Sequence, residues 1–350
     1  MTTARTRTLI SLAPMALLAA GIASCRGDST AAPPPSVTPG LLASRHAGDD
    51  PPRFSAWSAP VNLGAPVNSP LLEQSPTLSK DGLSLYFSSN RTDLPGALGN
   101  TDLWVSQRAC HDCPWETPVN LGAVINSFGN DGGPALSSDG HLLFFTSNRL
   151  GTNDIFVSRR AHSHDDRGWE PPVNLGPDVN TPGFETEPTY CRCAADDDED
   201  GVGMLYFSSG VGPGVGNDIY SAPVSREGVP LAPAVLVAEL STPTSNDAAP
   251  TLSRDGRNII FHSDRPGSVN FDLWISTRRS IHDAWSSPET LGSPPNSEFE
   301  ELQPYLSHDG RTLLFRSGPG RGGQGSFDIW MSTSTPSGDF DDEQDEEALP

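Results

Sequence analysis

The sequence predicts an all-β fold, a β-propeller built from five four-stranded blades. The 350-residue chain contains 34 glycines and 34 prolines, and its apolar residues, 35% of the total, occur in short runs. This composition is typical of many short strands joined by turns. No segment after the N-terminus shows sustained helical periodicity, and one hairpin-like motif recurs five times.

The first strand of each repeat opens near a proline and ends at an Asp-Gly pair. The prolines are Pro76, Pro134, Pro188, Pro250 and Pro304, at intervals of 54 to 62 residues. The glycines are Gly82, Gly140, Gly201, Gly256 and Gly310, each preceded by Asp. An Asp-Gly pair between two strands favours a hairpin turn in which glycine takes a positive φ angle. We therefore assign these pairs to structure.

Three further strands follow the turn. The second strand is apolar at consecutive positions, as in Leu142–Phe145, which predicts burial on both faces between stacked blades. The third begins with an Asp that we expect to cap turn amides, at Asp102, Asp154, Asp218, Asp272 and Asp328. The fourth carries a W-x-x-P-V-N-L-G motif or a variant of it, starting at Trp57, Trp115, Trp169 and Trp285, with a degenerate copy from Val229.

The order of these pieces predicts how the ring closes. The first Trp strand precedes every hairpin, and the last repeat, which ends at "DIWMS", has no Trp strand of its own. The Trp57–Leu63 strand is therefore expected to complete the fifth blade. Closure by both chain ends removes an exposed sheet edge.

At these motifs the sequence resembles the WD-repeat-like propeller repeats of the TolB type. The matching features are P-x-L-S-x-D-G, the apolar strand, S-N-R and D-[LI]-W, and they cover about 57–333. The resemblance implies a propeller and is specific for architecture, because propellers host unrelated activities. The separate N-terminal domain of TolB has no counterpart in this sequence.

The N-terminus resembles a bacterial lipoprotein signal. Arg5 and Arg7 precede an apolar run from Leu9 to Ile22, and "GIASC" ends at Cys25. The run is too short, and too interrupted by proline, for a dependable membrane span. The resemblance implies residues 1–25 as a signal peptide with lipobox Cys25 as the acylated residue. By the same resemblance, Arg26 after the cysteine implies an outer-membrane lipoprotein of the cell envelope, facing the periplasm or the surface. The alternative is an ordinary secretory leader.

The remaining segments follow from composition and charge. Residues 26–53 are rich in Pro, Ala, Ser and Gly and are expected to form a disordered tether. The propeller is expected over 54–335, and an acidic disordered tail over 336–350. The formal net charge of −22 disfavours nucleic acid and anionic lipid headgroups as partners, so the membrane is expected to be reached through the lipid anchor alone.

One position is acidic in all five repeats, three residues before the repeat proline. The residues are Glu73, Asp131, Glu185, Asp247 and Glu301. Five carboxylates around one mouth of a channel predict a binding site for a metal, a cationic group or a sugar. The structural alternative is that each carboxylate pairs with a turn amide or with an arginine such as Arg91, Arg149 or Arg265.

The third repeat contains an acidic insertion before its hairpin glycine. Asp196, Asp198 and Asp200 with Gly201 match the start of a D-x-D-x-D-G calcium loop. The twelfth position is Phe207, so the bidentate Glu of such loops is missing. Calcium is the one cofactor that the sequence suggests, and an acidic hairpin tip is the alternative interpretation.

Four cysteines remain beside Cys25. Close pairs outside the cytosol usually oxidise, and we expect the disulfide Cys110–Cys113. Cys191 and Cys193 are expected to be strained or free. A zinc site that uses both pairs is the alternative.

The sequence supports two classes of function. The first is an exported, lipid-anchored, monomeric propeller that binds a protein or a cell-envelope glycan without catalysis. The second is a glycoside hydrolase-like enzyme that uses carboxylates at the channel mouth, which needs two carboxylates in different environments. The nearly uniform acids of the repeats favour binding, and no nucleophile elbow, HExxH or phosphate loop is present.

Overall fold

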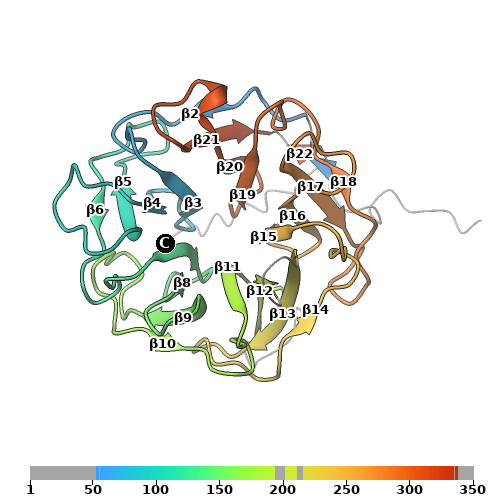
Figure 1. Ribbon diagram of the computed structural model, residues 1–350, viewed down its shortest axis with the longest axis horizontal. Helices are drawn as coiled ribbons and strands as arrows, with labels where there is room; N and C mark the ends of the chain where they lie inside the picture. The colour runs from blue at the N-terminus through green and yellow to red at the C-terminus, as the bar shows by residue number, and fades with distance from the viewer. Residues whose placement is uncertain (1–52, 55, 194–201, 211–215, 335, 338–350) are drawn as a thin grey trace, which may run out of the picture. The chain divides into compact units, whose positions relative to one another are not determined.

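The computed structural model describes residues 53–54, 56–193, 202–210, 216–334 and 336–337, all within the unit His46–Pro350. The strands form five four-stranded antiparallel sheets arranged around a common centre (Figure 1). The prediction of an all-β, five-bladed propeller is confirmed. In the described part of the chain, no helix is long and apolar enough to cross a membrane.

The strands of each blade follow one another from the centre outwards. Blade 1 contains β3 (Glu73–Leu78), β4 (Ser84–Ser89), β5 (Asp102–Gln107) and β6 (Val119–Asn120). Blade 2 contains β7 (Asp131–Leu136), β8 (Leu142–Ser147), β9 (Asp154–Arg159) and β10 (Val173–Asn174). Blade 3 contains β11 (Phe184–Cys191), β12 (Gly203–Gly210), β13 (Asn217–Val224) and β14 (Val235–Leu236). Blade 4 contains β15 (Asp247–Leu252), β16 (Asn258–Ser263), β17 (Asp272–Thr277) and β18 (Glu289–Thr290).

Blade 5 combines segments from both ends of the propeller. It contains β19 (Glu301–Leu306), β20 (Thr312–Ser317) and β21 (Asp328–Thr333), and its outer strand is β2 (Val61–Asn62). Strand β2 lies beside β21 (Figure 1), and Val61 pairs with Met331 and Asn62 with Trp330. The paired part is shorter than the Trp57–Leu63 strand expected from the sequence. A 3-10 helix, η1 (Pro319–Arg321), lies between β20 and β21, and β1 (Arg53–Phe54) pairs with β22 (Pro336–Ser337).

The blades are held together by the second strands. All six residues of β4, and likewise of β8 and β16, are buried, which explains why these runs do not alternate with polar residues. At the closing interface Leu85 and Phe87 of blade 1 share one core cluster with Leu314 and Ile329 of blade 5. Apolar burial of this kind is the main favourable contribution to the stability of the ring.

Three of the four tryptophans of the outer segments support a hairpin turn through an arginine. The Arg278 guanidinium lies 4.2 Å from the centre of the Trp285 ring, and its Nε donates to the Gly256 carbonyl oxygen at 2.7 Å. Arg108 with Trp115, and Arg160 with Trp169, repeat this arrangement at 4.5 and 4.3 Å. The stacked cation links the outer segment to the hairpin turn of the same blade.

Each innermost strand carries a β-bulge just before the repeat proline. In blade 1 the register shifts between Gln74 and Thr77, and the other four blades shift at the equivalent place. The bulge residues have φ angles of 50° to 58° and are Ser75, Gly133, Glu187, Ala249 and Gln303. A bulge re-aims a side chain out of the regular pleat, and here it directs these positions towards the centre of the ring.

Candidate functional site

The five acids at the strand starts are the first residues of β3, β7, β15 and β19 and the second residue of β11. All five are fully buried. Each accepts a hydrogen bond from the backbone N–H, and one from the hydroxyl, of a Ser or Thr four or five residues earlier. For Glu185 these donors are the Thr181 N–H at 2.9 Å and the Thr181 hydroxyl at 2.6 Å.

Further donors complete the environment of these carboxylates. A serine from the end of the second strand donates to four of them, such as Ser263 to Asp247 at 2.6 Å. Ion pairs join Arg149 to Asp131 at 2.7 Å and Arg265 to Asp247 at 2.5 Å. A third pair, which sequence reasoning missed, joins Arg321 of η1 to Glu301 at 2.8 Å.

Arg91 departs from the expected pairing. Its Nε pairs with Asp93 at 3.2 Å, and its terminal nitrogens donate to the Pro66 carbonyl oxygen, so its charge acts on Glu73 only from a distance. Burial raises the pKa of the Glu73 and Glu301 carboxyls, and hydrogen bonds from Ser69 and Ser297 partly oppose that shift.

The carboxylate ring is therefore closed to solvent. A fully buried carboxylate that already accepts several charge-assisted hydrogen bonds has no free oxygen to offer a ligand. The geometry corresponds to the structural alternative left open by the sequence, in which each acid stabilises the turn before its own strand. Asp102 and Asp328 cap backbone amides of the preceding turn in a similar way.

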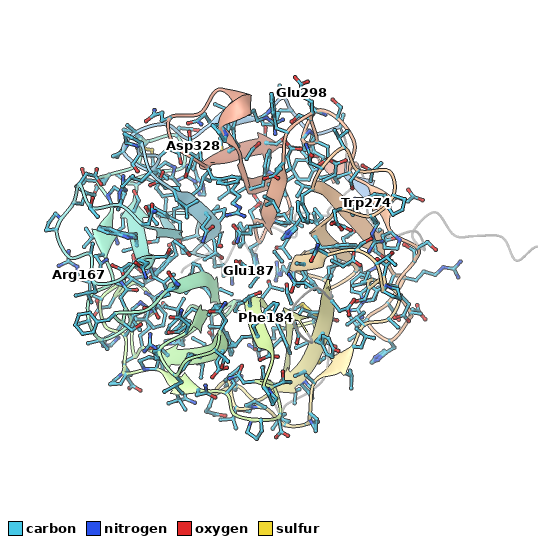
Figure 2. The ribbon with its side chains drawn as sticks, in the orientation of Figure 1. Arg167, Phe184, Glu187, Trp274, Glu298 and Asp328 are labelled. Atoms are coloured by element: carbon cyan, nitrogen blue, oxygen red, sulfur yellow. A yellow bond between two sulfur atoms is a disulfide. The ribbon has the colours of Figure 1, made fainter. Side chains whose placement is uncertain are left out.

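A different set of residues lies at the centre of the ring. A cavity of about 30 Å³ is bordered by the innermost strands of all five blades, and its lining includes the bulge residues Ser75, Glu187, Ala249 and Gln303. A volume of this size holds a water-sized guest. Glu187 is the one acid among the lining residues, and Figure 2 shows it close to the centre of the ring.

Glu187 is held by bulge residues from two other blades. Its Oε1 accepts from the Gln303 Nε2 at 2.5 Å and from the Ser75 hydroxyl at 3.1 Å. Its backbone N–H donates to the Thr146 hydroxyl at 3.1 Å. Burial raises the pKa of the Glu187 carboxyl, and the positive charge of Arg316 opposes this rise. A carboxyl with a perturbed pKa in a cavity is a functional candidate.

Two further ionisable residues, His262 and Arg316, occupy the second-strand positions equivalent to Thr146. Residues at the position of Thr146 in other blades accept the N–H of the next bulge residue, as Ser88 does from Gly133 and His262 Nδ1 from Gln303. Burial and the charge of Arg316 lower the pKa of His262 to about 3, so it is neutral at physiological pH. The fifth such position is Arg316, which cannot accept, and its Nη1 donates instead to the Gln74 Oε1.

The sequence contained a signal for this cluster that the repeat analysis did not use. The residue before the repeat proline varies between blades as Ser, Gly, Glu, Ala and Gln, and only the third is ionisable. The strand-start acids, by contrast, are of one kind in every repeat. The channel is instead lined by the position that differs most.

The other sequence-predicted sites fall in two groups. The expected Cys110–Cys113 disulfide is present. Cys191 and Cys193 were expected to be strained or free, and they are not free, because they form a disulfide with each other. Four cysteines paired in this way are not zinc ligands. Among the described residues, no group of three or more His, Cys, Asp or Glu side chains could hold a metal ion. Asp196, Asp198, Asp200 and Cys25 lie outside the described residues.

Comparison with known proteins shows a shared fold. No protein-family model matches the sequence, and no curated protein matches it. Among solved structures, the α-L-arabinofuranosidase from Lactobacillus brevis is 14% identical with a TM-score of 0.52, covering 79% of this chain and 97% of that one. The GH43_1 enzyme from Xanthomonas citri, complexed with xylotriose, is 15% identical with a TM-score of 0.52, covering 79% and 89%.

A protein described as TolB from Agrobacterium tumefaciens also matches. It is 20% identical with a TM-score of 0.42, covering 71% of each chain. At these identities the likeness to the two enzymes with TM-scores of 0.52 is one of fold.

Proposed function

We propose that this chain is an exported, lipid-anchored binding protein whose propeller holds a protein or cell-envelope glycan partner without catalysis. The observation that carries the proposal is the burial of all five strand-start carboxylates, each of which accepts bonds from its own turn. Hydrolysis of a glycosidic bond needs two carboxyl groups that reach the same bond. The cavity is bordered by one acid, Glu187.

Exposed apolar side chains support a binding role. Phe128 and Leu150 of blade 2 are 89% and 69% exposed. Their loops are joined, because the Asn130 N–H donates to the Asn148 Oδ1 at 2.7 Å. Neighbouring exposed apolar groups can form a contact site for a partner protein or for the apolar face of a sugar, and these two side chains on joined loops are the candidates for it.

The glycoside hydrolase-like alternative can be separated from binding in one experiment. Full-length protein is incubated with arabinan, xylan and peptidoglycan, and with proteins of the cell envelope under cross-linking, while released reducing ends are measured. We expect saturable association that weakens in Phe128→Ala/Leu150→Ala, with no released reducing ends. Release of reducing ends that disappears in Glu187→Gln or Glu185→Gln, with the fold retained, would instead establish the enzyme.

A further inference from the structure

The five bulge positions form an asymmetric set. Blade 3 supplies the acid Glu187, while blades 1 and 5 supply Ser75 and Gln303, which both donate to it. Blades 2 and 4 supply the smallest residues, Gly133 and Ala249. A non-glycine residue at φ near +50° is strained and persists only where the surrounding structure holds it there. Four of the five positions carry such a residue, and two of these, Ser75 and Gln303, hold the carboxyl of a third, Glu187.

One oxygen of the Glu187 carboxyl is left available. Oε1 takes both donors, and among the described residues no hydrogen bond reaches Oε2. A Cβ on Gly133 would lie 3.2 Å from Oε2 and 3.3 Å from the Glu187 Cα, so the glycine leaves room beside this oxygen. Glu187 is partly buried, and its Oε2 is not among the buried atoms without a partner, so this oxygen keeps accessible surface that a donor-bearing guest can reach.

Gln303 adds a second acceptor. Its Nε2 is engaged with Glu187, which fixes the orientation of the amide. The Gln303 Oε1 is buried and has no hydrogen-bond partner in the described structure. The Ser75 hydroxyl, which donates to Glu187, keeps lone pairs that can accept. The cluster is thus rich in acceptors around one carboxylate.

The neighbouring cation is already engaged. Arg316 donates to the Gln74 Oε1, and its guanidinium lies 4.5 Å from the centre of the Phe327 ring. It forms no ion pair with Glu187 within 4.0 Å, so it lowers the cost of the carboxylate charge without occupying the carboxylate. His262 is neutral and accepts from the Gln303 N–H.

We propose that the centre of the propeller binds the primary ammonium group of a ligand, with Glu187 as its counter-ion and Gln303 and Ser75 as further acceptors. The inference deepens the proposed binding function and rests on it. An ammonium group has the size of water and three donors, which matches the cavity of about 30 Å³ and its acceptors. A divalent metal fits less well, because the described residues provide no group of three acidic, His or Cys ligands.

The test uses full-length protein and methylammonium as the probe, titrated by calorimetry at constant ionic strength. We expect saturable binding of methylammonium and none of tetramethylammonium, which has no N–H donor. Glucosamine carries the ammonium group on a sugar, and Nα-acetyl-lysine amide carries it on an amino-acid side chain. Competition by one of them identifies the kind of molecule that brings the group. Equal heat from sodium chloride would overturn the proposal, because the site would then accept any monovalent cation.

Two variants make the test specific. Glu187→Gln keeps an oxygen for Ser75 and Gln303 but removes the charge, and we expect methylammonium to bind at least about tenfold more weakly. Glu298→Gln, at an exposed loop residue, is the matched control and should bind normally. Unchanged affinity in a folded Glu187→Gln protein overturns the proposal. If Glu187→Gln leaves the methylammonium affinity unchanged and the protein still binds its glycan or protein partner normally, the ammonium site is wrong while the proposed binding function stands.

Discussion

Two sets of side chains lie two residues apart on the same five strands, and they behave in opposite ways. The strand-start acids are alike in every blade, fully buried, and bonded to a Ser or Thr of their own turn. The bulge residues differ in every blade, and three of them meet at one carboxyl in the central cavity.

The comparison shows how residues with a structural role can be distinguished from residues that bind a ligand in a repeat protein. Each blade needs its own hydrogen bonds between the strand-start acid and the preceding turn, so the same kind of residue occurs in all five repeats. A site on the axis is shared by all blades, so each blade contributes a different part of it. Uniformity along the repeats therefore favours a structural role, and asymmetry favours the proposed ammonium site.

The largest predicted effect is the loss of stability when one of the strand-start acids is removed. Asp247→Ala leaves the buried Arg265, together with the hydroxyls of Thr242 and Ser263, without their acceptor. Removing one partner of a buried ion pair costs about 3–5 kcal/mol. Urea denaturation should show that loss in the free energy of unfolding.

The exposed Glu239→Ala is the control, and it should change the free energy of unfolding by less than about 0.5 kcal/mol. A loss as small as that in Asp247→Ala would show that the acid is not part of the architecture.

A smaller loss of stability is expected from a substitution at one of the bulge positions. Gly133→Ala places a Cβ at φ +58°, 3.2 Å from the Glu187 Oε2, and should cost about 1–3 kcal/mol of stability. It should also weaken methylammonium binding, because the free oxygen is crowded. The reverse change, Ala249→Gly at φ +50°, should cost no stability, and a loss there similar to that of Gly133→Ala would contradict the account of backbone strain.

The third effect depends on pH. The folded-state pKa of Glu187 is raised above its ordinary value of 4.5, so the folded protein holds this proton more tightly than the unfolded chain. Its contribution to stability is present below pH 4.5 and is lost as pH rises through the folded-state pKa. Glu187→Gln has no such loss, and its Tm relative to wild type should rise between pH 4.5 and pH 8.

The neighbouring ionisable groups do not change their charge between pH 4.5 and pH 8, so a change in the Tm difference over this range reports on Glu187. His262 titrates at about 3 and Tyr305 at about 12, and Arg316 stays charged. A Tm difference that is constant between pH 4.5 and pH 8 would show that the Glu187 carboxyl is not perturbed.

The sequence predicted the repeats better than it predicted the site. Five copies of the Asp-Gly turn and of the apolar strand specify blades, since each follows from local propensity and from burial on both faces. The pairing of Val61 and Asn62 with blade 5 followed from counting the Trp segments.

The contacts of Glu187 could not be predicted from the repeats of the sequence. Its partners Ser75 and Gln303 lie 112 and 116 residues away in sequence. They meet it only because a bulge turns each residue towards the axis. The contact between these residues leaves no local pattern in the sequence, and only the variation of the residue before each repeat proline points to it.

The central claim is that the Glu187 carboxyl is perturbed and open to a ligand while the strand-start acids are closed. Carbon-13 NMR of the side-chain carboxyls tests it most directly, with Glu187→Gln assigning the signal. We predict that Glu187 titrates above 4.5 and that methylammonium lowers its pKa, while the signals of Glu73 and Glu301 stay unchanged by methylammonium. A Glu187 signal that titrates at or below 4.5 and ignores methylammonium would contradict the account.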